Sequence, residues 1–407
     1  MVKLFNYIII EMRKLSAYFV LLLIIVSCQK PDPMQDVITR SFDVAARQAE
    51  LMAEYLDDKE GTLPRSYNAE KDEIITSASR WWCSGFYPGV LWYVYEYTDD
   101  PDHRALAEKY TARVEQEKFN TYDHDIGFQI NCSFGNGYRL TNRDDYKEVM
   151  KVAGKSAIQR YNPELGVIRS WNSNPNKWQY AVIIDNMMNL ELLMWNYHNT
   201  NEEIFKEVAV SHSDKTMEHH YRKDKSSYHV VSYDTLTGLP HVKQTHQGAF
   251  DESLWARGNA WGLYGYVVMY RETKLQRYLD QAIAIANLMI DHPNMPDDGI
   301  PYWDYLASDI PNAFRDASAG AIMASALVEL STMTDGDLSD KYISTAEKQL
   351  TALASPEYLA EPGTNGFFIL KRSVGHLPGN SEVDVPLTYA DYYFVEALLR
   401  YKALKGI

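Results

Sequence analysis

The stretch FRDASAGAIMASALVELSTM, residues 314–333, carries apolar or small side chains on almost every face that a helix would present. A helix of this kind is buried on all sides. Residues 182–197 share this character, whereas residues 101–117, 142–161 and 201–220 carry charges along one face, which is typical of half-exposed helices. Buried and half-exposed segments in alternation predict two concentric layers of helices.

Helical periodicity continues from residue 35 onward, and strand-like alternation is scarce. We expect twelve helices, near residues 35–57, 80–98, 101–117, 126–138, 142–161, 182–197, 201–220, 252–271, 274–292, 314–333, 338–354 and 384–404. Six helices in each of two layers form an all-α (α/α)6 barrel. An open helical solenoid is the alternative, but no clean sequence repeat supports it. No linker divides residues 35–407, so these residues are expected to form one domain.

Short β segments are expected only in loops at the mouth of this barrel. The stretch from Tyr228 to Pro240 alternates between polar and apolar residues and contains a turn. It predicts a hairpin at the mouth, where long loops tend to carry function.

The 407 residues are 46% hydrophobic and 23% charged, which provides enough apolar material for a large core. This composition excludes a disordered chain, a collagen-like repeat and a disulfide-rich miniprotein. The formal net charge of −15 opposes binding to nucleic acid, because the phosphate backbone is itself negative. The chain holds 30 Tyr and 9 Trp residues, whose flat faces pack in cores and also against sugar rings. Trp82 and Trp171 are candidates for stacking on a sugar, with core packing as the alternative.

Residues 1–27 are predicted to be a targeting segment outside the fold. The apolar run from Leu15 to Val26 is too short for a membrane-spanning helix. The run ends in Ser27-Cys28 and matches the bacterial lipobox, in which the cysteine is lipidated and becomes the new N-terminus. We therefore expect residues 28–34 to be a tether and the lipid on Cys28 to be the only membrane attachment. The predicted location is the cell envelope, with the protein anchored in the outer membrane and facing the periplasm; a plain cleaved secretory signal is the alternative.

The two remaining cysteines, Cys83 and Cys132, are too few for a disulfide framework. In an exported chain they either form one disulfide or stay as two separate buried thiols. Since no Cys and His residues cluster with metal-ligand spacing, the sequence predicts neither a metal site nor a cofactor.

Two aspartates lie in settings that favour catalysis. Asp185 lies within the apolar run Ala181–Met188, where loss of solvent raises the pKa of an unpartnered carboxyl group. A raised pKa suits a general acid that works near neutral pH. Asp125 precedes an apolar helix, and the two residues together offer the carboxylate pair of glycosidic chemistry. The structural alternatives are a helix N-cap for either residue, or a buried ion pair for Asp185.

The densest group of polar and aromatic residues ends at Trp261. On a helix, Arg257 and Trp261 lie four residues apart and share a face. There the guanidinium group can bind a planar carboxylate while the indole stacks on the sugar ring. The alternative is a structural ion pair between Arg257 and a neighbouring acid, Asp251 or Glu252.

The motifs, taken together, resemble those of glycoside hydrolase family 88, the unsaturated glucuronyl hydrolases. They occur in family order across residues 35–405 and are jointly specific, although each alone is weak. The motifs are Trp82-Cys-Ser-Gly-Phe, His124-Asp125-Ile-Gly-Phe, Ile184-Asp185-Asn-Met-Met-Asn, Ser227-Tyr-His229, Thr245-His-Gln247-Gly, Trp255-x-Arg257-Gly-x-Ala-Trp261, Tyr302-Trp-Asp, Arg315-Asp-x-Ser-Ala and Ala390-Asp-Tyr-Tyr-Phe-Val-Glu-Ala-Leu-Leu-Arg.

The resemblance implies an (α/α)6 barrel and an unusual reaction. Such enzymes act on the Δ4,5-unsaturated glucuronic acid that lyases leave at the non-reducing end of glycosaminoglycan-type oligosaccharides, and they hydrate its C4=C5 double bond. Carried over by motif, Asp185 is the acid and base, and Asp125 is the second catalytic carboxylate. The resemblance also implies that the substrate-binding residues are His124, His229, Gln247, Arg257, Trp82, Trp171, Trp255 and Trp261.

Two other hypotheses stay open at this point. One is an unsaturated rhamnogalacturonyl hydrolase acting on pectin products, and the other is a non-catalytic glycan-binding lipoprotein. The basic segment Lys371-Arg372-Ser373 is either a solvated loop or a contact for a sulfate on the second sugar. The sequence does not choose among the polysaccharides that would supply the substrate.

Overall fold

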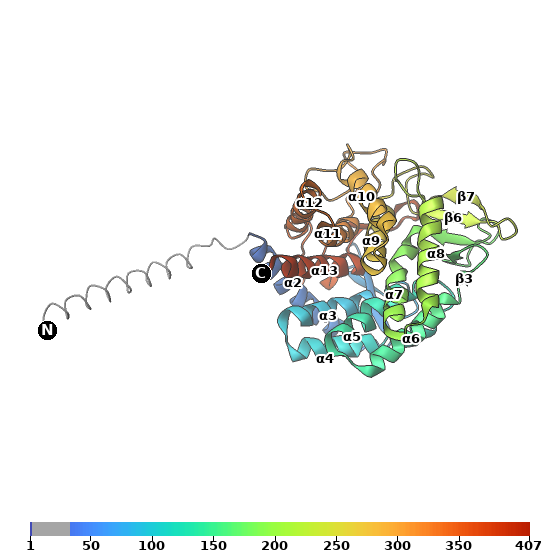
Figure 1. Ribbon diagram of the computed structural model, residues 1–407. Coiled ribbons are helices and arrows are strands. Elements are labelled where there is room, and N and C mark those ends of the chain that lie inside the picture. The colour runs from blue at the N-terminus through green and yellow to red at the C-terminus, as the bar shows by residue number, and fades with distance from the viewer. Residues whose placement is uncertain (2–32) are drawn as a thin grey trace. The chain divides into compact units, whose positions relative to one another are not determined.

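The computed structural model describes Met1 and residues 33–407 (Figure 1). The predicted targeting segment, the lipidation site Cys28 and nearly all of the predicted tether lie outside the described residues. The chain divides into two compact units, Met1–Asp36 and Val37–Ile407, and the fold described below is that of the second unit.

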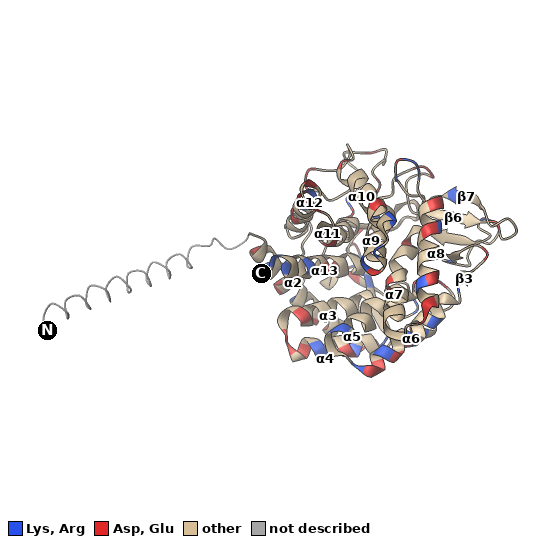
Figure 2. Ribbon diagram, in the orientation of Figure 1, with Lys and Arg blue, Asp and Glu red and all other residues tan. Residues whose placement is uncertain are grey.

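Helices in two layers make up this unit. The inner layer consists of α3 (Phe86–Thr98), α5 (Asn136–Thr141), α7 (Leu190–Thr200), α9 (Ala256–Thr273), α11 (Ala317–Ser331) and α13 (Thr388–Lys405). The outer layer consists of α2 (Pro33–Tyr55), α4 (Pro101–Ala112), α6 (Asp144–Ile158), α8 (Glu203–His219), α10 (Gln276–Ile290) and α12 (Asp337–Leu353). The inner helices α9, α11 and α13 are buried along most of their length. In the ribbon of Figure 2, charged residues recur along outer helices such as α4, α6 and α8.

The inner layer is a closed ring. Neighbouring inner segments pack against one another in chain order, with η2 (Gly127–Gly135), which leads into α5, making the contact with α7, and α13 returns to pack against α3. An open solenoid leaves its first and last helices apart, so this contact excludes it and confirms the predicted (α/α)6 barrel.

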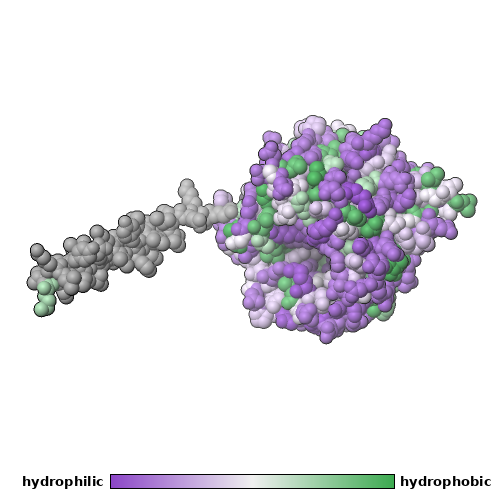
Figure 3. All heavy atoms as spheres, in the orientation of Figure 1, coloured by the Kyte–Doolittle hydropathy of each residue, from purple (hydrophilic) through white to green (hydrophobic). Residues whose placement is uncertain are grey.

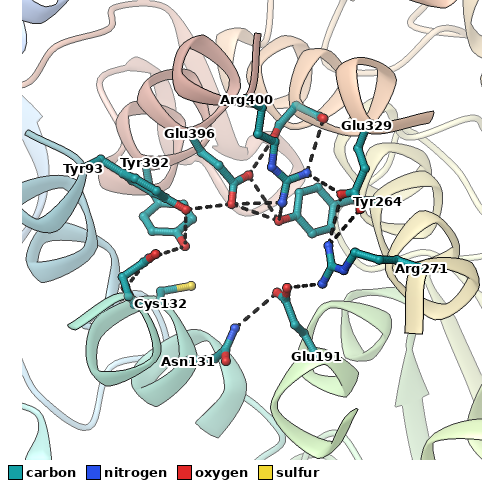
Figure 4. A network of polar contacts seen from close by, with 12 residues as sticks. Tyr93, Asn131, Cys132, Glu191, Tyr264, Arg271, Glu329, Tyr392, Glu396 and Arg400 are labelled. Carbon is teal, nitrogen blue, oxygen red and sulfur yellow. Dashed lines mark hydrogen bonds and ion pairs between the residues drawn. The ribbon is translucent and has the colours of Figure 1, made fainter. Parts of the chain in front are cut away.

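A buried polar network joins all six inner segments of the ring (Figure 4). The Glu396 carboxylate accepts hydrogen bonds from Tyr93 Oη at 2.9 Å and Tyr264 Oη at 3.0 Å. Arg400 binds Glu329, Arg271 bridges Glu329 and Glu191, and Asn131 donates to Glu191. The members of the network come from α3, η2, α7, α9, α11 and α13. A cavity of about 590 Å³ lies beside this network, and the face of the molecule drawn in Figure 3 is mostly hydrophilic and hollowed near its centre.

Two inner segments depart from regular helix. The helix expected over 126–138 is a π-helical segment, η2 (Gly127–Gly135), which continues into α5. The helix expected over 182–197 begins as strand β5 (Ala181–Ile183) and a 3-10 turn, η3 (Ile184–Asn189), before α7 starts. The segment η2 begins two residues after Asp125, and η3 contains Asp185 in its first turn. Such π-helical and 3-10 segments often occur at functional sites.

The short strands lie in connections between helices. The hairpin predicted from Tyr228 to Pro240 is present as β6 (Val230–Tyr233) and β7 (Pro240–Gln244), and β5 pairs antiparallel with β6 to complete a three-stranded sheet. The other antiparallel pairs are β1 (Thr62–Asn68) with β2 (Glu73–Ala78), β3 (Tyr161–Asn162) with β4 (Val167–Ile168), and β8 (Ser373–His376) with β9 (Ser381–Val385).

Two open questions of the sequence have simple structural answers. Cys83 and Cys132 are both buried and free, so they are two separate thiols. Within residues 33–407 no helix combines the length and the apolarity that crossing a membrane requires.

Candidate active site

Asp185 lies where strand β5 gives way to the 3-10 turn η3. The Ile183 N–H donates to Ser170 Oγ at 2.9 Å, which fixes the end of the strand. The Asp185 side chain keeps 15% of its surface exposed, but its Oδ2 atom is buried and has no hydrogen-bond partner. Burial raises the pKa of Asp185 to about 6, against the opposing effects of the Arg257 charge and the Trp261 N–H. The buried ion pair and the helix cap considered from the sequence are both absent.

Asp125 reaches the same site from the start of η2. The close approach of η2 to η3 requires a glycine at position 127, because a Cβ atom there would lie only 2.4 Å from Asn189 Oδ1. The backbone of η2 therefore packs directly against the Asn189 side chain of η3. Asn189 Oδ1 accepts the Phe128 N–H at 3.0 Å and locks this contact. Burial raises the pKa of Asp125 well above its usual range, and the nearby charges of Asp123 and Asp185 raise it further.

Asp123 is a third carboxylate of this site, and sequence reasoning missed its role. Its Oδ1 atom accepts the Asp125 N–H at 3.0 Å and the Asn120 amide at 2.8 Å. Burial raises its pKa as well, while Arg160 lies close enough to oppose the rise. Asp123 directly precedes the motif His124-Asp125, but nothing in one sequence separates a turn-forming aspartate from one that positions a neighbour.

His124 and His229 present neutral imidazoles to the two carboxylates. His124 Nε2 lies 3.4 Å from Asp125 Oδ1, and burial lowers the pKa of this histidine to about 3. His229 Nε2 lies 3.7 Å from Asp185 Oδ2, and burial lowers its pKa well below the usual range. Each carboxylate therefore faces a histidine that carries no charge at neutral pH.

The predicted tryptophans line up along the site in two groups. Trp255 packs over His229, with ring centroids 4.6 Å apart, and Trp171 meets the same histidine edge-on at 6.1 Å. Trp82 and Trp261 both pack against Phe128, at 5.6 and 5.3 Å. Trp261 is fully buried, so its ring belongs to the core and its N–H is the part that acts on Asp185.

Arg257 is held by the protein on all sides. Its two terminal nitrogens donate to Asp316 at 3.2 Å, to Gln247 Oε1 at 3.3 Å and to the carbonyl oxygens of Val374 and Gly375. Its ion-pair partner is Asp316, and not Asp251 or Glu252 as the structural alternative supposed. Asp316 also accepts the Ser318 N–H at the start of α11, so it ties the arginine to the inner ring.

The structure thus brings all ten predicted site residues to one end of the barrel, near the N-terminal ends of the inner segments. Besides Asp123, two residues that belong with them were not singled out beforehand, Asp316 and Tyr389; Arg257 lies over the Tyr389 ring at 5.4 Å. Both are next to or inside quoted motifs, which was the available signal. The arrangement offers a proton-holding carboxyl group beside neutral histidines and aromatic walls. Over residues 33–407 no group of three or more His, Cys, Asp or Glu side chains is arranged to hold a metal ion.

Comparison with known proteins places this geometry in a family. The family model for Glycosyl Hydrolase Family 88 matches residues 52–402. The chain belongs to glycoside hydrolase family 88. A curated relative in this family is the unsaturated glucuronyl hydrolase of Formosa agariphila, which is 43% identical over 339 residues, covering 83% of this chain and 84% of the relative.

Two solved family 88 structures share the fold. An unsaturated glucuronyl hydrolase specific for heparin is 44% identical, with a TM-score of 0.88, and the match covers 91% of this chain and 98% of that one. A variant of the Streptococcus agalactiae enzyme complexed with dGlcA-GalNAc6S is 26% identical, with a TM-score of 0.76, covering 90% and 92%. Family membership makes the protein a glycoside hydrolase and rules out the hypothesis of a non-catalytic glycan-binding protein.

Proposed function

We propose that the protein removes Δ4,5-unsaturated glucuronic acid from the non-reducing end of lyase-generated, glycosaminoglycan-type oligosaccharides. The bond attacked first is the C4=C5 double bond, to which water is added. The names of the relatives, unsaturated glucuronyl hydrolases from several sources, support this activity over the rhamnogalacturonyl alternative.

The observation that carries the proposal is the Asp185 carboxyl group, whose Oδ2 atom is buried without a hydrogen-bond partner and whose pKa burial raises to about 6. Near neutral pH such a group can hold a proton and still release it. Asp185 protonates C4, and its conjugate base then accepts a proton from the water that adds at C5. The product at C5 is a hemiketal, which opens to a keto sugar and releases the rest of the oligosaccharide. One carboxyl group therefore serves as acid and then as base.

Asp125 supports this reaction from the adjacent segment. A second ionised carboxylate beside Asp185 would oppose its deprotonation. The pKa of Asp125 is itself raised, mainly by burial and further by the charges of Asp123 and Asp185. Neutral His124 and His229 can donate or accept hydrogen bonds to substrate hydroxyls without adding charge. Trp171 and Trp255 form the aromatic wall on the His229 side of the site.

The basic segment Lys371-Arg372-Ser373 bears on whether a sulfate on the second sugar is recognised. The basic segment suggested for a sulfate contact already has protein partners: Lys371 Nζ donates to the Pro356 carbonyl at 2.6 Å, and Arg372 pairs with Glu357. A sulfate bound there would have to compete with these contacts. We therefore expect unsulfated unsaturated disaccharides to be accepted at least as well as those sulfated on the second sugar.

The experiment uses a panel of unsaturated disaccharides, from chondroitin, hyaluronan and heparin, with and without sulfate. Turnover destroys the conjugated double bond, so the ultraviolet absorbance of the substrate falls. In heavy water the released keto sugar should carry deuterium at C4, where Asp185 delivers the proton. An absence of turnover on every member of the panel, or a product without deuterium at C4, would contradict the proposal.

We also propose that the mature protein is a lipoprotein anchored through Cys28 in the outer membrane and facing the periplasm. The support is the lipobox ending of the apolar run that precedes this residue. An anchored enzyme would meet oligosaccharides as they enter the periplasm. Mass spectrometry of the mature N-terminus would detect acyl groups on Cys28.

A further inference from the structure

The peptide unit that joins His246 and Gln247 lies between two histidine side chains. On one side, His376 Nε2 lies 2.9 Å from the His246 carbonyl oxygen, and because a carbonyl can only accept, the imidazole donates. On the other side, the Gln247 N–H of the same peptide unit donates to His229 Nδ1 at 3.2 Å. The His246 N–H donates to this nitrogen as well, at 3.1 Å.

These contacts decide which nitrogen of His229 carries the proton. Two N–H groups point at Nδ1, so Nδ1 is the acceptor and the neutral ring has its proton on Nε2. The Nε2–H then faces Asp185 Oδ2 across 3.7 Å, and neither atom has another partner. A continuous polar path runs from His376 through one peptide unit and His229 to the carboxyl group of Asp185.

His376 is itself held in place by the fold. It ends strand β8 and pairs with Ser381 of β9, and the two preceding carbonyls, of Val374 and Gly375, are bound by Arg257. Its ring lies 4.7 Å from the His246 ring. The ring also lies against Gly379, where a Cβ atom would be only 2.7 Å from His376 Nδ1.

We propose that His376 is a positioning residue that acts on Asp185 through the 246–247 peptide unit and His229. The inference rests on the proposed role of Asp185. Donation from His376 to the carbonyl polarises the peptide and strengthens the N–H bond that the same peptide makes to His229 Nδ1. The imidazole is thereby fixed in the orientation and tautomer that present Nε2–H to Asp185. Hydrogen bonds of this kind are often long without substrate and shorten in the transition state.

Kinetics of His376→Ala and His376→Gln test the inference. The alanine variant loses the donor, and we expect kcat to fall on the order of tenfold with little change in KM, as for other partners that orient a working histidine. Glutamine keeps an N–H donor at similar reach, so His376→Gln should retain more activity than His376→Ala. His198→Ala is the matched control, because His198 lies on α7, lines the 590 Å³ cavity beside the polar network and pairs with Glu272.

The pH profile separates positioning from a general loss of structure. Asp185 is faced by Asp125 from the start of η2, by Arg257 from α9 and by His229. If His229 loosens, the ionised carboxylate loses a donor, so the alkaline limb of kcat/KM moves to higher pH. If His376 had only a structural role, its loss would lower the fraction of active enzyme and would not move the alkaline limb of the kcat/KM profile.

Gly379→Ala perturbs the same path without touching any of its hydrogen-bonding atoms. The added methyl group displaces the His376 ring from the His246 carbonyl. We expect this variant to reproduce the fall in kcat and the shift of the alkaline limb. Wild-type kinetics in folded His376→Ala, or a fall in kcat with an unmoved limb in both variants, would overturn the inference.

A spectroscopic measurement keeps the inference testable without turnover. Nitrogen chemical shifts of labelled histidine distinguish the two neutral tautomers. In the wild-type protein His229 should be protonated on Nε2. In His376→Ala its Nδ1 resonance should move toward the value of an imidazole that exchanges between its two neutral tautomers. An unchanged resonance overturns the inference. If wild type turns over no unsaturated disaccharide but this resonance moves, the proposed function fails and the positioning path stands.

Discussion

His229 Nε2 lies 3.7 Å from Asp185 Oδ2, and neither atom has another hydrogen-bond partner. Buried polar atoms in proteins are almost always satisfied, so an unsatisfied pair facing each other is unusual. Fixed by two backbone N–H groups on its other nitrogen, the imidazole cannot turn to find a different acceptor. We therefore expect the distance between His229 Nε2 and Asp185 Oδ2 to shorten when Asp185 transfers its proton to the substrate, because negative charge then develops on the carboxylate.

Replacing Asp185 with asparagine should abolish turnover and leave the fold intact. The amide keeps the shape of the side chain but cannot exchange the proton, so the acid and base steps fail together. We expect kcat to fall on the order of 10³-fold or more, measured by loss of substrate absorbance. Asp291→Asn, on the surface and paired with Lys341, is the control and should keep wild-type activity. A folded Asp185→Asn enzyme with substantial turnover would remove Asp185 from the mechanism.

Asp125→Asn should also impair the enzyme, by a different route. The amide removes a carboxyl group whose ionisation is coupled to that of Asp185, and it loosens the contact with His124 at 3.4 Å. We expect kcat to fall on the order of 10²-fold, because positioning and charge are lost while the acid itself remains. The same absorbance assay measures the loss. If kcat of Asp125→Asn equalled that of Asp185→Asn at every pH, the two carboxylates would share one role in the reaction.

The raised pKa of Asp185 also predicts a pH-dependent cost in stability. In the unfolded chain the pKa of an aspartate is about 3.9, and in the folded protein that of Asp185 is about 6. Between these values the folded state keeps a proton that the unfolded state releases, so the free energy of unfolding falls as pH rises through this window. The full loss, about 3 kcal/mol, is reached above pH 6 or so.

Asp185→Asn has no such titration, which gives the test. The free energy of unfolding of Asp185→Asn minus that of wild type should be about 2 kcal/mol larger at pH 8 than at pH 4, as measured by urea denaturation at both pH values. At pH 4 the unfolded wild-type chain has already lost about half of this proton, so the comparison covers most but not all of the loss. Comparing the two pH values cancels the effect of the substitution itself. If the free energies of unfolding of variant and wild type differed by the same amount at both pH values, the pKa of Asp185 in the folded protein would not be raised.

The fold was predictable because its main signal is local. The burial of a helix such as 314–333 could be predicted because the helix has almost no polar face. The ends predicted for α8, α10, α11 and α12 lie within three residues of the observed ones. The irregular segments were not predictable in this way. The π-helical turn η2 and the strand-to-3-10 junction at Asp185 have helix-like periodicity in the sequence. In the fold these two neighbouring segments meet at the close contact of Gly127 with Asn189, which no local pattern indicates.

The members of the site could be recognised, but their contacts could not. Asp185 was identifiable from its apolar surroundings and His229 from its motif. Nothing in the sequence indicates that Asp316, 59 residues from Arg257, is its partner. His376 gave no signal at all, because its effect on Asp185 passes through a backbone peptide that any sequence contains.

Membrane attachment should depend on Cys28. In Cys28→Ala the lipid cannot be added, and each buried acyl CH₂ group contributes about 0.8 kcal/mol to membrane binding. The acidic chain, with its net charge of −15, has no electrostatic attraction to an anionic surface that would replace the lipid. The variant should move from the membrane to the soluble fraction after cell lysis, while wild type stays with the outer membrane. A variant that still fractionates with membranes would require a second anchor.

Arg257→Ala should destabilise the fold as well as the site. The Arg257 and Asp316 side chains are 2% and 0% exposed, so removing the arginine leaves a buried carboxylate without its counter-ion. Breaking one side of such a pair typically costs about 3–5 kcal/mol in the free energy of unfolding. The Val374 and Gly375 carbonyls lose their donor as well, which frees the β8–β9 hairpin and lowers activity.

The matched control is Arg277→Ala, which breaks a bidentate pair of the same chemistry with Asp214 on the surface. Both side chains there are 40% exposed, so water replaces the lost partner and the expected cost is below about 1 kcal/mol. Urea denaturation of the two variants measures the difference directly, and Arg257→Lys should fall nearer to the alanine variant, because an ammonium group cannot serve four acceptors in a plane. Equal costs for Arg257→Ala and Arg277→Ala would mean that Arg257 is solvated in solution and free to bind a substrate carboxylate.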